Sequence, residues 1–107
     1  MTDHQPIVVL VTAGSVQNAE TIARALVEER LAACVNVLPG VRSIYRWQGR
    51  VADDSEWLLV IKTSRERFAA VETRVRALHT YEVAEVIALD IALGSTPYLE
   101  WLRAETA

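Results

Sequence analysis

Residues 7–11 read Ile-Val-Val-Leu-Val, an unbroken apolar run in which every residue except Leu10 is β-branched. This pattern is typical of a strand covered on both faces, and it predicts a central strand of a sheet. A second run of this kind, Trp-Leu-Leu-Val-Ile, occupies residues 57–61. Between the two, Ser15 can cap a helix that extends to about Arg30, because apolar residues recur there three and four positions apart. The fold is therefore expected to rest on two interior strands.

The segment from Ala33 to Trp47 predicts a long strand with alternating side chains, which Pro39-Gly40 interrupts. Proline has no N–H for a strand ladder, so the break is expected at a bulge or at a sheet edge. Gln48-Gly49 then turns the chain toward residues 57–61. A long edge strand presents unpaired backbone groups that isolated proteins usually protect, and this strand therefore favours association with another copy.

Thr63, followed by Glu66 three residues later, has the spacing of a capping box that opens a second helix ending near His79. A last strand is expected at about residues 86–92. Thr96-Pro97 then begins a short C-terminal helix, with Thr96 as its cap. The order strand, helix, strand, strand, helix, strand predicts an α+β, ferredoxin-like βαββαβ fold with two helices on one face of an antiparallel sheet. Residues 1–107 are expected to form a single domain.

The composition is that of a folded domain, with 51% hydrophobic and 23% charged residues in a chain of 107. A net charge of -3 lacks the excess of Lys and Arg that nucleic-acid binding requires, so no DNA or RNA partner is expected. No stretch has the character of a signal peptide or a membrane span. Cys34 is the only cysteine and cannot form an internal disulfide, so a cytoplasmic location is expected. A domain of this size also buries more apolar surface when it associates.

Several separate motifs lie in one order along the chain: Leu31 to Asn36, Tyr45 to Gly49, Ile61 to Thr63, His79 to Glu85, and Tyr98 to Trp101. By these motifs the chain resembles the CutA divalent-ion tolerance family over almost its whole length. The resemblance implies a non-enzymatic protein involved in the response to metal ions, copper above all. It also implies a homotrimer in which the second and third strands pair between subunits, similar to the trimer of the PII signalling proteins.

His79 is the strongest candidate metal ligand, since imidazole binds borderline metals and titrates near neutrality. The helix dipole also favours a histidine at a helix C-terminus, so a purely structural role stays open. Glu85 adds a carboxylate nearby, and the two would hold a divalent cation, Cu or Zn, weakly. Some copper-binding members of the family have a thiol and a second histidine where this chain has Val11 and Leu78. Cys34 is expected to be a core thiol, so a tight copper site is not expected.

A ligand-binding cleft between subunits is expected near the segment that follows the second helix. The residues expected to line it are Lys62, Tyr45, Trp47, Glu56, Tyr81 and Glu85. Lys62 ends an apolar strand, where its stem can be buried while its ammonium faces Glu56, Glu85 or an anionic ligand. An ion pair at a subunit contact is the structural alternative for Lys62. For the aromatic side chains the alternative is simple packing.

Two other functions fit the same residues. One is a small hydrolase or isomerase in which His79 acts as general base beside Glu82 or Glu85, although no phosphate loop or nucleophile elbow accompanies it. The other is a trimeric scaffold for a protein partner. The substitution His79→Ala separates these readings: lost turnover would favour the enzyme, whereas lost ligand or metal binding on an unchanged trimer would favour the binding protein.

Overall fold

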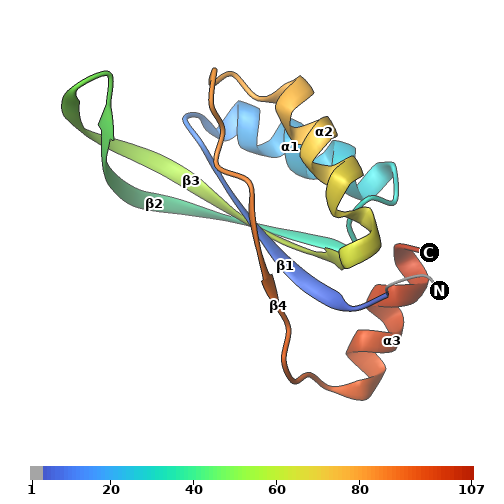
Figure 1. Ribbon diagram of the computed structural model, residues 1–107. Coiled ribbons are helices and arrows are strands. Elements are labelled where there is room, and N and C mark those ends of the chain that lie inside the picture. Colours follow the sequence, from blue (N-terminus) through green and yellow to red (C-terminus); the bar gives the residue numbers. More distant parts are fainter. Residues whose placement is uncertain (1–3) are drawn as a thin grey trace.

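The computed structural model describes residues 4–107 and confirms the expected α+β fold (Figure 1). Its elements are β1 (Pro6–Ala13), α1 (Val16–Glu28), β2 (Cys34–Trp47), β3 (Arg50–Ser64), the 3₁₀ turn η1 (Arg65–Arg67), α2 (Phe68–Leu78), β4 (Ile87–Asp90) and α3 (Thr96–Glu105). The strands form one antiparallel sheet in the order β2-β3-β1-β4. The two most apolar runs therefore lie in the sheet interior, as predicted.

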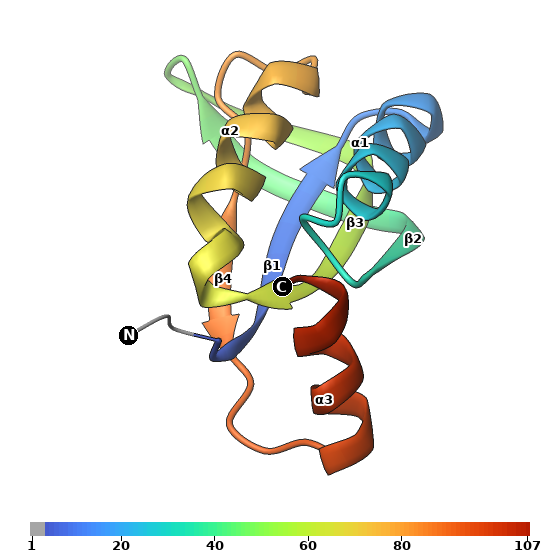
Figure 2. The same cartoon turned by 90° about the vertical axis from the view of Figure 1, so that its right-hand side faces the viewer.

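The core lies between one face of this sheet and helices α1 and α2, which cover that face side by side (Figure 1, Figure 2). The fully buried side chains here include Val9, Val11, Leu59 and Ile61 of the sheet and Ile22, Leu26, Val71 and Val75 of the helices. Burying an aliphatic side chain of this size stabilises a fold by about 1.5–3 kcal/mol. This layer is therefore the main source of stability within the chain.

Helix α3 packs against the end of the sheet and covers neither of its faces fully (Figure 2). Leu102 is buried there, and the hydroxyl oxygens of Ser64 and Thr106 lie 2.5 Å apart. None of the helices within residues 4–107 is long and apolar enough to cross a membrane.

Strands β2 and β3 form a hairpin that projects well beyond β1 and β4 (Figure 1). Gln48 and Gly49 at its tip have φ of 50° and 78°, the left-handed geometry of a tight two-residue hairpin turn. The pairing shifts between Leu38 and Val41, and Gly40 has φ of 74°. The Pro-Gly break is therefore a bulge on an edge strand, as the sequence predicts.

The predicted lengths of two strands are wrong. β3 extends far beyond residues 57–61, because its polar first half stays paired with β2 along the hairpin. Arg42 supports this pairing through a bidentate ion pair with Asp53, with N–O distances of 2.9 and 2.6 Å. The last strand is shorter than residues 86–92, since it pairs with β1 only at residues 87–90.

Of the three predicted helix caps, one is confirmed and two are wrong. Ser15 caps α1, since its Oγ accepts a hydrogen bond of 3.1 Å from the backbone N–H three residues on. Thr63 instead stays in β3, fully buried, and its hydroxyl donates a bond of 2.7 Å to the carbonyl oxygen of Leu31. Thr96 is the first residue of α3, and Ser95 occupies the cap position without a side-chain bond. A tertiary hydrogen bond has thus replaced the local one at Thr63.

The second face of the sheet is turned away from α1 and α2 and is rich in apolar residues. By strand alternation and register it carries Val8, Leu10, Leu38, Leu58, Val60, Ile87 and Leu89. Leu38, Ile87 and Leu89 are 41%, 51% and 56% exposed. Within residues 4–107 this second face has no helix layer of its own, and a single copy of the chain therefore leaves much of it open to solvent.

Candidate functional site

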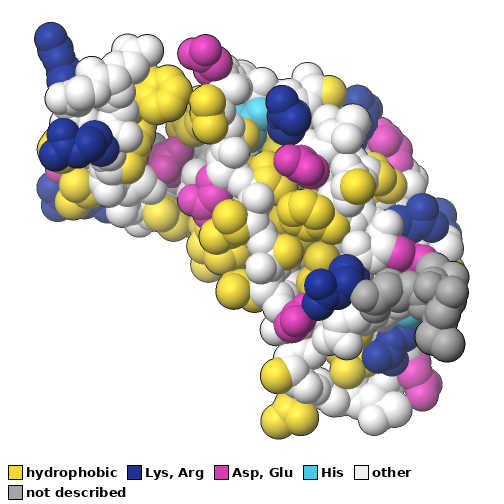
Figure 3. Space-filling view, viewed as in Figure 1, with side chains coloured by type: hydrophobic (Ala, Val, Ile, Leu, Met, Phe, Trp, Pro, Cys, Tyr) yellow, Lys and Arg dark blue, Asp and Glu magenta, His cyan; other side chains and the backbone are white. Residues whose placement is uncertain are grey.

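A cleft of about 820 Å³ lies between the projecting hairpin and the loop that joins α2 to β4. Tyr45 and Trp47 line it from β2, Glu56 from β3, and residues 81–85 from the loop. Thr12 adds the end of β1. Figure 3 shows acidic side chains in the hollow between the hairpin and the body of the molecule. The cleft therefore combines aromatic walls with carboxylates.

The most buried polar contact of the cleft joins Tyr81 to Glu56. The phenol donates a hydrogen bond of 2.6 Å to Oε2 of Glu56, whose side chain is only 4% exposed. Burial, and then this bond to a carboxylate, raise the pKa of Tyr81 well above its usual value. The phenol therefore stays protonated at neutral pH and acts as a fixed donor to the Glu56 carboxylate.

Gly14 lets the ring of Tyr81 reach this position. A Cβ at residue 14 would lie 2.8 Å from the phenol oxygen, closer than real Cβ atoms approach. The sequence alone does not reveal this role of Gly14, because its contact with Tyr81 is a tertiary one. Glycine is needed here for the close approach of a side chain and not for an unusual φ.

His79 orients the same loop. Its Nε2 lies 2.7 Å from the carbonyl oxygen of Thr12 and donates to it, while Nδ1 accepts a hydrogen bond of 3.0 Å from the backbone N–H of Tyr81. The imidazole also contacts the ring of Tyr81, with centroids 4.6 Å apart. Both ring nitrogens are thus engaged by backbone groups. His79 could bind a metal only after one of these bonds breaks.

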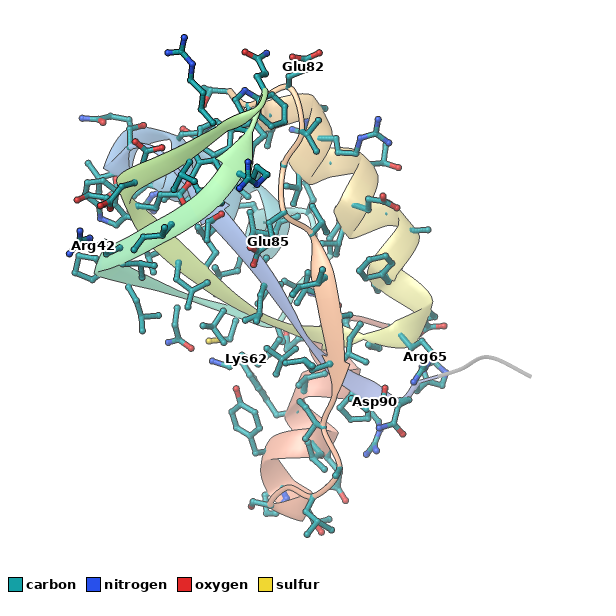
Figure 4. The ribbon with its side chains drawn as sticks, turned by 60° about the vertical axis from the view of Figure 1, so that its left-hand side comes forward. Arg42, Lys62, Arg65, Glu82, Glu85 and Asp90 are labelled. Carbon is teal, nitrogen blue, oxygen red and sulfur yellow. The ribbon has the colours of Figure 1, made fainter. Side chains whose placement is uncertain are left out.

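Glu85 faces the hairpin from the loop, whereas Glu82 points outward (Figure 4). Partial burial, and then the charge of Glu56, raise the pKa of Glu85 above its usual value. Tyr45 donates a hydrogen bond of 2.5 Å to Asp54, and this bond is the main reason that the pKa of Tyr45 is raised. Asp54 therefore adds a carboxylate beside Tyr45 that the sequence did not predict.

Lys62 is the one predicted cleft residue that the structure places elsewhere. It lies six residues along β3 from Glu56, which is about 20 Å in a strand, and it bonds to the side-chain oxygen of Asn36. Cys34 is its cross-strand partner and interacts with Tyr98. The other five predicted residues meet in one cleft, whereas Lys62 could reach such a cleft only from a second copy.

The described chain contains no preformed metal centre. Among residues 4–107, no group of three or more His, Cys, Asp or Glu side chains is arranged to hold a metal ion. Glu56 is engaged by Tyr81, and His79 by two backbone groups. Glu85 is the predicted ligand that keeps its oxygens available.

Comparison with known proteins decides the family. The family model described as CutA1 divalent ion tolerance protein matches residues 7–105. The chain belongs to the CutA1 divalent ion tolerance family. It is 58% identical over 99 residues to the divalent-cation tolerance protein CutA of Thermus thermophilus, covering 92% of this chain and 96% of the relative. It is also 51% identical to human protein CutA, and the matched region covers 90% of this chain and 54% of the human protein.

Solved CutA1 structures have the same fold. The Thermus thermophilus structure matches with a TM-score of 0.93 at 56% identity, covering 95% of this chain and 99% of that one. The CutA1 structure from Oryza sativa matches with a TM-score of 0.94 at 44% identity, covering 100% and 98%. Relatives are named as chloroplastic in Arabidopsis thaliana and as periplasmic in Archaeoglobus fulgidus. The family thus occurs in several compartments, and the cytoplasmic location expected from sequence stays a prediction.

Proposed function

We propose that this CutA1-family chain is a non-enzymatic, homotrimeric protein that binds a metal ion or small ligand in the response to divalent cations. The observation that carries the proposal is the cleft, in which a buried Glu56–Tyr81 pair stands beside the accessible carboxylate of Glu85. An enzymatic role finds less support, because a general base needs a free nitrogen and both nitrogens of His79 are bonded.

The apolar second face of the sheet supports assembly. Strands β2 and β4 are both sheet edges, so each has a row of backbone groups without a strand partner in the described chain. Helix α3 adds two aromatic residues to this exposed surface, Tyr98 at 41% exposure and Trp101 at 43%. A second and third copy would cover these surfaces, in line with the strand pairing between subunits that the sequence resemblance implies.

The cleft opens on this second face, because Thr12 and Glu56 lie on the same side of the sheet as Leu58. A neighbouring subunit would then border the cleft. We therefore propose that the ligand site is completed on assembly, as expected for a cleft between subunits.

A divalent cation, Cu²⁺ or Zn²⁺, would bind here through Glu85 and water, and weakly. A tighter site would need His79 to give up its bond to Thr12 or to the backbone of Tyr81. Such a site would carry mixed nitrogen and oxygen ligands, which suit Zn²⁺ and Cu²⁺.

The test is a calorimetric titration of the metal-free protein with Cu²⁺ and Zn²⁺, combined with light scattering. The wild type should scatter as three copies of an 11.9 kDa protomer. Saturable binding that Glu85→Gln weakens, with Glu28→Gln as a charge-matched control, would support a metal site in the cleft. A monomeric mass, or binding that neither Glu85→Gln nor His79→Ala changes, would contradict the proposal.

A further inference from the structure

We infer that the cleft binds a small organic cation, an alkylammonium or guanidinium group, held between the Glu56 and Glu85 carboxylates and the aromatic walls. The inference rests on the ligand-binding function proposed above and adds the chemical class of the ligand. It comes from the donors, acceptors and charges that the cleft presents.

The two phenols of the cleft offer a ligand acceptors and no free donors. The hydroxyl hydrogens of Tyr45 and Tyr81 are both used, since they point to Asp54 and Glu56 at 2.5 and 2.6 Å. The phenols therefore present lone pairs to a ligand, while Thr12, Ser43 and Trp47 supply hydroxyl and indole groups. The charged acceptor that a ligand meets here is the Glu85 carboxylate, which favours a ligand with hydrogen-bond donors.

The charged side chains of the cleft are mostly acidic, and this also favours a cationic ligand. Glu56 and Glu85 line the cleft with their carboxylates, whereas Glu82 lines it but points its carboxylate outward (Figure 4). Arg42 is its one cationic side chain among residues 4–107, and this guanidinium is already paired with Asp53 through two hydrogen bonds. Burial, and then repulsion by the Glu56 charge, raise the pKa of Glu85. A bound cation would remove this repulsion.

The aromatic walls favour an organic cation over a metal ion. Tyr45 and Trp47 are 39% and 42% exposed on the hairpin, and Tyr81 faces them from the loop. Aromatic faces attract ammonium and guanidinium groups and pack against their alkyl chains. A group of three or more His, Cys, Asp or Glu side chains that could hold a metal ion is absent from the described part of the chain. The cleft volume of about 820 Å³ also exceeds what a bare ion requires.

The same chemistry could come from two sources, a free small molecule or a cationic side chain of a neighbouring copy. Lys62 is the candidate side chain, because it lies on the second face and bonds only a neutral amide in the described chain. We favour the free molecule, since the cleft has room for more than one side chain. The experiment separates the two.

The intact oligomer is titrated with n-butylammonium and n-butylguanidinium, with n-butanol as the neutral analogue and butyrate as the anionic one, in the presence of a metal chelator. The cations should bind saturably and at least about tenfold more tightly than n-butanol, because hydrogen bonds to charged groups are the stronger ones. Glu85→Gln should weaken cation binding by about tenfold, and Trp47→Leu by a few fold. The control Glu28→Gln, on the far helix, should bind like the wild type.

Equal binding of n-butanol and the cations would overturn the inference and leave a ligand-binding cleft in place. Binding of butyrate in preference to the cations would overturn it too. Unchanged cation binding in Glu85→Gln would place the cation elsewhere and refute it. If the organic cations bind to Lys62→Gln but not to the wild type, the cleft does select a cation, and in the wild type that cation is the Lys62 ammonium of a neighbouring copy. If no organic probe binds to the wild type or to Lys62→Gln, while Cu²⁺ or Zn²⁺ does bind, the inference is refuted and the proposed metal-binding function stands.

Discussion

Replacing Tyr81 by Phe tests the central contact of the cleft. The substitution keeps the ring against Gly14 and His79 and removes only the donor to Glu56. A hydrogen bond to a charged group contributes about 1.5–3 kcal/mol, and the penalty for a carboxylate left buried without its donor lies in the same range. Because Glu56 is 4% exposed, water cannot easily replace the phenol. We expect Tyr81→Phe to lower the free energy of unfolding by about 2 kcal/mol.

The assay is urea denaturation followed by fluorescence and circular dichroism, at one protomer concentration for all variants. Equal concentrations matter because the proposed trimer would dissociate as it unfolds. Tyr45→Phe is the matched control, since it removes an equally short hydrogen bond to Asp54 from an exposed position. Its loss should be much smaller, because water can take the place of an exposed phenol.

A loss for Tyr81→Phe no larger than that for Tyr45→Phe would refute the reasoning, because Glu56 would then be hydrated in solution. The variant Glu56→Gln gives a second check. Its amide oxygen can still accept from Tyr81, and the buried charge is gone, so it should lose less stability than Tyr81→Phe. The opposite order would also contradict the proposed contact.

Three further substitutions test other parts of the structure. Gly14→Ala should lower the free energy of unfolding by about 1–3 kcal/mol, because the new Cβ must displace the Tyr81 ring. Unchanged stability in the same denaturation assay would contradict this close contact. Thr63→Val should cost about 1–2 kcal/mol by leaving the carbonyl of Leu31 without its donor, which a capping role for Thr63 would not predict. Glu85 has a raised pKa in the folded chain, so its ionisation lowers stability as pH rises from its usual pKa of 4.5 through the folded value. Glu85→Gln should therefore raise the melting temperature at pH 7 and leave it unchanged near pH 4, and equal effects at the two pH values would contradict this assignment.

The sheet order was predictable from sequence, because it depends on where apolar residues gather. The runs at residues 7–11 and 57–61 are apolar on both faces, and only an interior strand buries both. The bulge at Pro39-Gly40 was equally clear, since proline lacks the donor that a ladder needs. The polar start of β3 was missed because residues 53–56 have low strand propensity and are held by pairing with β2.

The candidate site was predictable only where its residues are close in sequence or carry family motifs. Tyr81 and Glu85 share one loop, and Tyr45 and Trp47 share one strand. Lys62 belongs to the same strand as Glu56, yet six residues of extended chain keep their side chains apart. Membership of a motif therefore identifies candidate residues, but strand geometry decides which of them can meet within one subunit.

His79 shows why residue type alone does not assign a role. Its sequence position after α2 fits a metal ligand and a structural residue equally well. The carbonyl of Thr12 and the N–H of Tyr81, which are far apart in sequence, hold its two ring nitrogens in defined directions. Both bonds fix the start of the loop that forms a wall of the cleft. We therefore expect His79→Ala to weaken any cleft ligand by loosening Tyr81, whether or not imidazole touches that ligand. His79→Asn, whose amide can both donate and accept, should restore part of the binding if this positioning role is correct. Failure of Asn to restore any binding, with the fold intact, would favour direct contact by the imidazole.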